Sequence, residues 1–203
     1  LLSFGAMALS LHLLIWMRHS VLFFAAWELM SMSSFFALMY DKENAETVRS
    51  GFYYFIMMHV GALFLIAGFA LSYLSTGSFC FNDYHALPLL PALLLMIGFS
   101  FKAGFFPFYS WLPKAHPAAP SHISGLMSGL IIKTGIFGIL LVLNMCNPSH
   151  LMILGMGVAS LLTAFFGVIH ALVETNIKRI LAYSSIENIG IIGLGITVGL
   201  LGK

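Results

Sequence analysis

The sequence has few charged residues and almost no cysteine. Of its 203 residues, 8% are charged, and the nine Lys and Arg are nearly balanced by seven Asp and Glu. This small positive surplus excludes a nucleic-acid-binding surface, which needs many clustered cations. The two cysteines are too few for the four thiolates of an iron–sulfur cluster, and no C-x-x-C or H-E-x-x-H motif is present to bind zinc. We therefore expect no metal site and no cofactor.

Long apolar runs fill most of the chain. Hydrophobic residues make up 60% of the sequence, and the mean hydropathy of +0.99 does not fit a water-soluble fold. A helix needs about 20 mostly apolar residues to cross the hydrocarbon core of a bilayer. Seven runs reach about this length, at residues 1–17, 20–40, 51–74, 87–106, 122–144, 151–173 and 180–202. The sequence predicts an all-α, polytopic membrane helix bundle with about seven transmembrane helices.

The Lys and Arg residues are unevenly distributed among the loops between these runs. The first, third and fifth loops together have one, Arg18, whereas the second, fourth and sixth have five, namely Lys42, Arg49, Lys114, Lys178 and Arg179. Because cytoplasmic loops have an excess of Lys and Arg, the even-numbered loops are expected to face the cytoplasm. The sequence begins inside an apolar run, without an initiator Met or a basic leader. It is expected to be an internal piece of a longer protein of the cell inner (cytoplasmic) membrane.

Charged residues inside the apolar runs are the strongest functional signal. Four are present: Glu28, Lys102, Lys133 and Glu187. Inserting a charge at mid-helix costs roughly 2.5 to 3.5 kcal/mol, and such residues mark ion and proton pathways. Lys133 lies near the middle of its run, too deep for its side chain to reach either membrane surface easily. We expect these residues to carry protons; the alternative is that they pair helices for assembly.

A helix break is predicted next to Lys102. Pro107 has no backbone N–H and clashes with the carbonyl group of Ala103, and Gly104 makes the break easier. Interrupted helices at membrane depth line water-filled cavities and ion sites. A lysine there can gain or release a proton when a carboxylate moves nearby, and Glu28 is the partner expected by charge.

Two of the eight histidines are candidates for the same pathway. His59 lies near mid-depth in its run, and His122 begins the run that contains Lys133. A hydrogen-bonded packing role is the alternative for both. His116 falls in a proline-rich loop and is expected at the membrane interface. A haem held between helices needs two histidines at matched depth, and no convincing pair is present.

Three strings resemble one family of membrane proteins. They are WELM at residues 27–30, FKAGFFPFYSWLPKAHPAAPSHISGLMSGLIIKTGIFGI at 101–139 and NIKRILAYSSIENIG at 176–190. These strings are similar to those of the antiporter-like membrane subunits of respiratory complex I, Mrp-type cation/proton antiporters and membrane-bound hydrogenases. Within the family, the K-A-H-P-A-A-P-S-H segment and the E-N-I-G ending most resemble the large antiporter-like subunit of formate hydrogenlyase and hydrogenase-4 complexes.

The resemblance implies roles for individual residues. The family's glutamate on its fifth helix corresponds to Glu28, the lysine on its broken seventh helix to Lys102, and the central lysine on its eighth helix to Lys133. The family's next relay residue, on its twelfth helix, has no counterpart here. Asn176 stands where the family usually has Asp, which leaves the relay intact. Glu187 lies about as deep in its run as Glu28 does, and is expected to titrate in the second half of the pathway.

The resemblance also implies two five-helix repeats of inverted topology. Residues 1–144 are then expected to form the first repeat, and residues 145–203 the first two helices of the second.

The expected function is that of a proton-translocating subunit of a redox-driven complex, similar to a hydrogenase or an NADH:quinone oxidoreductase. The subunit would have no redox site of its own, and its partners would be other membrane subunits, the lipid bilayer and protons. The alternative is a subunit of an Mrp-type antiporter that exchanges Na⁺ or K⁺ for protons. A structural membrane anchor and a haem-binding electron carrier are two further possibilities.

Overall fold

The computed structural model describes residues 2–41 and 43–202, and most of them lie in helices. In chain order the elements are α1 (Leu2–Trp16), α2 (Ser20–Leu38), α3 (Ala45–Thr76), the short 3-10 helix η1 (Phe81–Asp83), α4 (Leu89–Ala103), the 3-10 turn η2 (Phe108–Trp111), α5 (Leu112–Ala118), α6 (Ser121–Leu126), the π-helical turn η3 (Met127–Ile131), α7 (Ile132–Met145), α8 (His150–Val173) and α9 (Ile177–Leu201).

The membrane-spanning segments agree with the fold class predicted from the apolar runs. Six segments within the described residues are long and apolar enough to cross a membrane, namely 20–38, 45–76, 89–118, 121–145, 150–173 and 177–201. The first predicted run corresponds to α1, an apolar helix of 15 described residues. The prediction of an all-α, polytopic membrane bundle is confirmed, and the protein is a multi-pass integral membrane protein.

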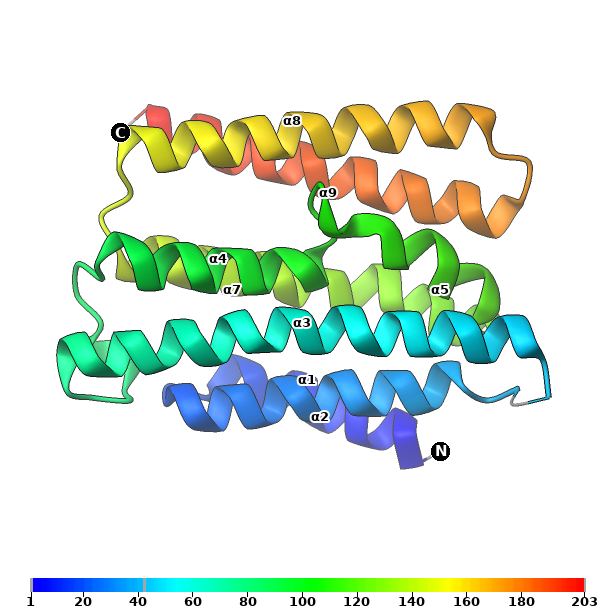
Figure 1. The fold of residues 1–203 in the computed structure, drawn as a ribbon, viewed down its shortest axis with the longest axis horizontal. Coiled ribbons are helices and arrows are strands. Elements are labelled where there is room, and N and C mark those ends of the chain that lie inside the picture. The colour runs from blue at the N-terminus through cyan, green and yellow to red at the C-terminus, as the bar shows by residue number, and fades with distance from the viewer. Residues whose placement is uncertain (1, 42, 203) are drawn as a thin grey trace.

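The helices lie side by side along the long axis of the molecule (Figure 1). α8 and α9 pack on each other along one side, α4 and α7 lie in the middle, and α3 lies between α4 and the α1–α2 pair. The α4–α7 contact is very close because α7 has glycines where it crosses α4. A Cβ atom at Gly135 would lie 2.5 Å from the backbone nitrogen of Ala103, so no larger residue fits there without a shift.

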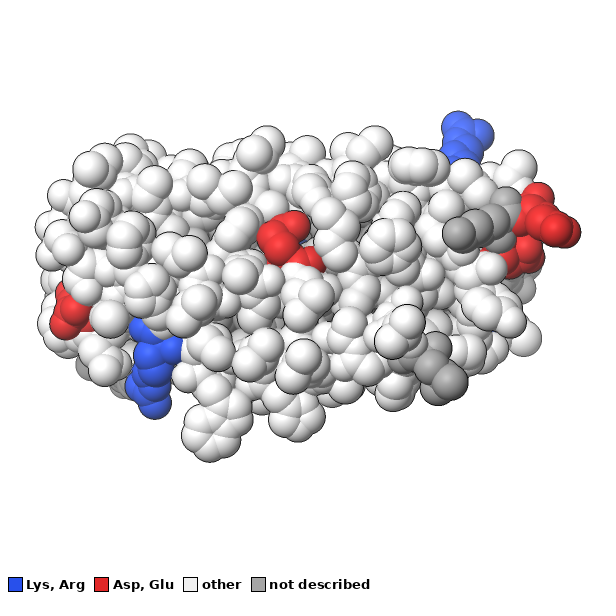
Figure 2. Space-filling model, turned by 90° about the horizontal axis from the view of Figure 1, so that it is seen from below, with Lys and Arg blue, Asp and Glu red and all other residues white. Residues whose placement is uncertain are grey.

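The loops gather at two ends of the bundle. At one end, which we call the odd-loop end, the loops 17–19, 77–88 and 146–149 meet, and Leu87 donates a backbone hydrogen bond to Met145. At the other, the even-loop end, the loop segments 39–41, 43–44, 119–120 and 174–176 meet, and Lys178 Nζ donates to the carbonyl oxygen of Ala119. Figure 2 shows charged side chains near both ends of one long face and a single acidic group midway between them. Which end faces the cytoplasm stays a prediction.

Candidate functional site

The site is built around a break in the helix that contains Lys102. α4 ends at Ala103, and Gly104 follows in the left-handed conformation with a φ of 79°. Only glycine adopts this conformation without strain, which is why it commonly ends helices. Regular α-helix resumes at Leu112, where α5 begins. The break expected from the sequence is therefore present, and Lys102 lies in the last turn before it.

Side chains satisfy backbone groups that the break leaves without helical partners. Trp111 Nε1 donates to the carbonyl oxygen of Phe101 at 2.9 Å. The backbone N–H of Phe106 donates to Thr163 Oγ1 of α8 at 2.8 Å. An unsatisfied backbone group at membrane depth costs several kcal/mol. The interrupted backbone is thus stabilised in part by a residue of a distant helix.

Lys102 is enclosed by the protein and directed at α2. Its side chain is 1% exposed. The ammonium Nζ donates to Ser31 Oγ at 2.7 Å, and the carbonyl oxygen of Trp27 lies 3.4 Å away. The same nitrogen lies 4.0 Å from the centroid of the Trp27 ring, a cation–π distance. One hydroxyl, one carbonyl and one aromatic face therefore stabilise this group in place of water.

Glu28 lies on the same turn of α2, but its carboxylate contacts a different residue. Glu28 Oε2 lies 3.4 Å from His59 Nε2 of α3. Three ion pairs are present in the described part of the chain, and none of them joins Glu28 to Lys102. The direct pair expected from charge is thus absent there. Lys102 instead contacts Trp27 and Ser31, which flank Glu28 in the helix.

The Glu28–His59 contact places an imidazole nitrogen opposite a carboxylate oxygen. His59 Nδ1 lies 2.9 Å from the carbonyl oxygen of Phe55, and a carbonyl oxygen can only accept, so Nδ1 has the hydrogen. In a neutral ring, Nε2 would then be an acceptor that faces the carboxylate oxygen. Two acceptors repel each other. A proton on either the imidazole or the carboxyl group would make this contact a hydrogen bond.

Lys133 lies at the start of α7 in more open surroundings. Its side chain is exposed, and Nζ donates to the carbonyl oxygen of Ser128 at 3.2 Å. Ser128 belongs to the π-helical turn η3, and such turns are frequent at functional sites. The lysine lines a cavity of about 360 Å³ together with Ser185 and Asn188 of α9. Lys133 therefore faces the α9 side of the bundle, whereas Lys102 faces α2.

The other two predicted relay residues lie apart from both lysines. Glu187 is half-buried on α9, where a Cβ atom at Gly167 of α8 would lie 2.7 Å from its backbone nitrogen. His122 is exposed on α6 and lines a cavity of about 580 Å³. Within residues 2–41 and 43–202, no hydrogen bond or ion pair joins either side chain to Lys102 or Lys133. Their roles stay predictions.

The prediction that His116 lies in an interfacial loop is wrong. His116 belongs to α5 and is 3% exposed. Its Nδ1 lies 2.6 Å from Ser124 Oγ, and its Nε2 is buried with no hydrogen-bond partner among the described residues. The prolines of this segment suggested a loop, but Pro113 lies in the first turn of α5, where a missing N–H has no cost. A regular helix formed around these prolines.

Sequence reasoning also missed Ser31, which is 2% exposed and accepts the hydrogen bond of Lys102. Serine is common in membrane helices, where it bonds its own backbone. Ser31 does this too, since its hydroxyl donates to the Trp27 carbonyl. The sequence pattern of WELMSMSS alone does not indicate which of its serines faces α4.

Residues 18–202 match the family described as NADH:quinone oxidoreductase/Mrp antiporter, TM. The chain belongs to this family. The resemblance found in the sequence strings is thereby confirmed, and it extends to individual members. Hydrogenase-4 component B of Escherichia coli (strain K12) is 40% identical over 197 residues, which cover 92% of this chain and 29% of the relative. The putative antiporter subunit mnhA2 of Staphylococcus haemolyticus is 35% identical over 192 residues, covering 88% of this chain and 24% of the relative.

A solved membrane complex contains a chain with the same fold. Respiratory complex I from Thermus thermophilus contains a chain that superposes with a TM-score of 0.80 at 29% identity, covering 93% of this chain and 42% of that one. The present chain thus spans less than a third of the length of the two relatives and under half of the solved chain. The activities of these relatives are therefore properties of molecules longer than this chain.

Proposed function

We propose that this chain is part of a proton-translocating membrane subunit of a redox-driven complex of the hydrogenase or NADH:quinone oxidoreductase type. The observation that carries the proposal is Lys102, a buried lysine at a break in a membrane-spanning helix. The similarity to hydrogenase-4 component B supports the type of complex. We place the subunit in the cell inner membrane, in contact with other membrane subunits. Redox chemistry would take place in those partners.

In this proposal the Glu28–His59 pair and Lys102 act together. A proton gained or lost at this pair would change its charge. Lys102 is bonded to the turn of α2 that contains Glu28, and a change of charge there alters how strongly Lys102 retains its own proton. The energy delivered by the redox partners would drive this change of charge.

Lys133 is the proposed next proton carrier. Its exposed ammonium group and the cavity that it shares with α9 fit a group that exchanges protons with water. Glu187 on α9 is proposed as the titratable group that continues the path in the second repeat. His122 is proposed as a further proton-carrying group of the path, near the surface of the bundle. The proposed repeats are residues 1–144 and 145–203.

A second candidate function is exchange of Na⁺ or K⁺ for protons in an Mrp-type antiporter. The 35% identity to a putative antiporter subunit favours this alternative. The same buried charges would serve it, and no redox partner would be needed. The purified complex can be assayed for proton transport without an electron donor. If this transport requires Na⁺ or K⁺, the antiporter function is correct.

The proposal is tested by replacing Lys102 in the protein that contains this chain, in its native membrane. Lys102→Met keeps the length of the side chain and removes the charge, so proton transport should be abolished while the complex assembles. The matched control is Lys114→Met, because Lys114 is exposed and its Nζ lies over the ring of Tyr53, 3.6 Å from the centroid. Unchanged proton transport in the assembled Lys102→Met protein would overturn the proposal.

A further inference from the structure

Buried hydroxyl groups line the contact between α2 and α3. On α2, Ser31 is 2% and Ser34 0% exposed, and on α3, Tyr54 is 0%, Ser50 9% and Thr47 4% exposed. Residues three or four positions apart share one face of a helix, so the three α3 residues form a single stripe. The hydroxyl groups thus extend from the position of Lys102 toward the start of α3.

The inner part of this series is hydrogen-bonded. Lys102 Nζ donates to Ser31 Oγ at 2.7 Å, and Ser34 Oγ donates to the carbonyl oxygen of Ser31 at 2.9 Å. The Tyr54 hydroxyl lies 2.6 Å from Ser34 Oγ. Because the one hydrogen of Ser34 is directed at Ser31, Tyr54 must be the donor to Ser34. The hydroxyl hydrogens of Tyr54 and Ser34 therefore both point toward the turn of α2 that Lys102 contacts.

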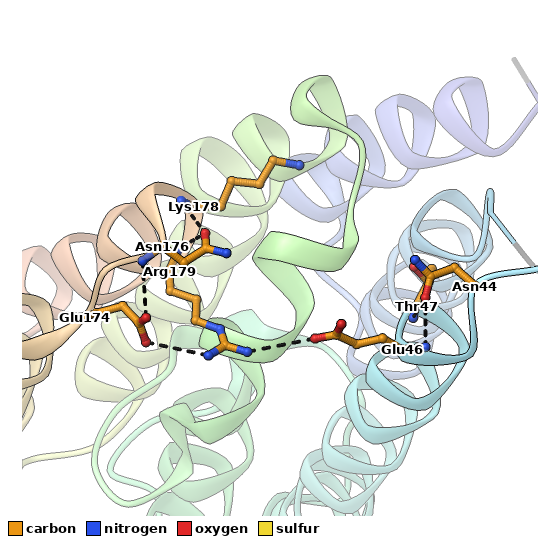
Figure 3. Close-up of polar contacts among 7 residues, drawn as sticks. All are labelled: Asn44, Glu46, Thr47, Glu174, Asn176, Lys178 and Arg179. Atoms are coloured by element: carbon orange, nitrogen blue, oxygen red, sulfur yellow. Dashed lines mark hydrogen bonds and ion pairs between the residues drawn. The ribbon is translucent and has the colours of Figure 1, made fainter.

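The outer part of the series reaches a polar cavity at the even-loop end. Thr47 lines this cavity of about 420 Å³ together with charged residues, among them Lys178 and Arg179 in the first turn of α9. Figure 3 shows Thr47 next to Asn44 in the first turn of α3, with Glu46 directed at Arg179 across the gap between α3 and α9. Charged and amide groups make this cavity a place that water can occupy.

We propose that Thr47, Ser50, Tyr54, Ser34 and Ser31 form a proton-uptake path from this cavity to Lys102. The path rests on the proposed function of Lys102. A neutral Lys102 amine takes the Ser31 hydroxyl proton. Ser31 then takes a proton from a water molecule that lies between Ser31 and Ser34. That water takes a proton from Ser34. Ser34 is resupplied by Tyr54, and Tyr54 by water along the stripe of Ser50 and Thr47. One proton leaves the cavity and one arrives at Lys102, and each hydroxyl ends with one hydrogen, received from its neighbour in place of the one it passed on.

Ser33, next to Ser34 in the sequence, provides a control that distinguishes an effect on proton transfer from an effect on packing. Ser33 is 4% exposed and its hydroxyl donates to the carbonyl oxygen of Met30, so it resembles Ser34 in burial and in its bond to the backbone. Unlike Ser34, it has no hydrogen bond to another side chain among the described residues. Ser33→Ala is therefore a matched control for Ser34→Ala.

The test uses the full-length protein in its native membrane and measures initial rates of proton transport in H2O and D2O. Tyr54→Phe and Ser34→Ala should each lower the rate several-fold at unchanged amounts of assembled complex. They should also increase the ratio of the rates in H2O and D2O, because proton uptake becomes rate-limiting. Ser33→Ala should match the native protein in both measurements.

Two results would overturn the path. In one, Tyr54→Phe and Ser34→Ala keep native rates and isotope ratios. In the other, Ser33→Ala slows transport as much as Ser34→Ala does, which would indicate a packing effect. Lys102→Met, measured in parallel, separates the two proposals. If it abolishes transport while the hydroxyl variants do not slow it, the path fails and the proposed function stands; if it transports normally, the proposed function itself fails.

Discussion

The surroundings of Lys102 and of Lys133 differ, although both lysines lie within the membrane-spanning part of the chain. Lys102 is 1% exposed and contacts a hydroxyl, a carbonyl and an aromatic ring, all from α2. Lys133 is exposed and bonds one carbonyl of its own helical segment. The first environment consists of packed side chains from the α2 side of the bundle, and the second is a cavity that α9 completes.

This difference suggests a division of roles. A buried ammonium loses its hydration, so it persists only where fixed groups replace water. Lys102 has such groups, and a change of charge nearby acts on a side chain that cannot move far. Lys133 has a single fixed hydrogen bond within the described part of the chain and lines a cavity. In the proposed function, the enclosed lysine responds to charge and the open lysine passes protons onward.

Arginine substitutions should separate the two sites most strongly. Lys102→Arg places a larger, planar group in a filled space, and overpacking typically costs about 1 to 3 kcal/mol. We expect loss of proton transport and a lower melting temperature of the complex. Lys133→Arg enters an open cavity and should retain most of the transport. Equal effects of the two substitutions, measured by transport and by thermal unfolding, would contradict the distinction between the sites.

The contact between α4 and α7 connects the two environments, because Gly135 of α7 lies against Ala103, next to Lys102. Gly135→Ala forces a Cβ atom to within 2.5 Å of the Ala103 nitrogen, so the helices must separate. We expect destabilisation of about 1 to 3 kcal/mol, measured by thermal unfolding, with slower transport. Gly125→Ala is the control, since apart from its chain neighbours and its own helix backbone no atom of the described residues lies within 4 Å of a Cβ there. Its stability should be native or slightly higher.

Substitutions of Thr163 test whether the helix break depends on a contact with α8. Its hydroxyl accepts the hydrogen bond of the Phe106 N–H and donates to the carbonyl oxygen of Ala159. Thr163→Val leaves that N–H without an acceptor, which costs roughly 1 to 3 kcal/mol. The melting temperature should fall, and transport should slow because Lys102 lies next to the break. Thr163→Ser keeps the hydroxyl and should behave as the native protein; a comparable loss in the serine variant would point to packing instead.

The smallest effect is expected far from both lysines, at the even-loop end. Arg179 lies 3.9 Å from Glu46 and 3.7 Å from Glu174, and it is 43% exposed (Figure 3). Backbone N–H groups, chiefly that of Asn176, lower the pKa of Glu174, so its stabilising effect is present at neutral pH and is lost as the pH falls through the lowered pKa. Arg179→Gln should change the melting temperature little at physiological salt, because exposed ion pairs are weak and screened. A large loss of assembly would refute this expectation.

The sequence predicted the bundle and the break well because both follow from local composition. Apolar runs of about 20 residues gave the spans, and Pro107 with Gly104 gave the interruption. The pairing of buried groups was less predictable. Glu28 was matched to Lys102 by charge, whereas its carboxylate contacts His59, since the rotation of each helix decides which side chains meet.

The prolines around His116 also led to a wrong prediction, that of an interfacial loop. Prolines usually break helices, but Pro113 lies in the first turn of α5, where a helix tolerates it, and α5 continues through Pro117; the histidine between them is buried against Ser124. The hydroxyl series on α2 and α3 gave no usable signal, because serine and tyrosine occur throughout membrane helices for structural reasons. Only the three-dimensional contacts separate Ser34 from Ser33.

The bond between Phe106 and Thr163 joins residues that are 57 positions apart in the chain. When the ribosome delivers the chain to the membrane, the interrupted segment therefore arrives well before α8 can supply its hydroxyl. Until then, the exposed N–H must be hydrated or bound by the insertion machinery. The segment around Lys102 would reach its final form only after the following helix has been inserted.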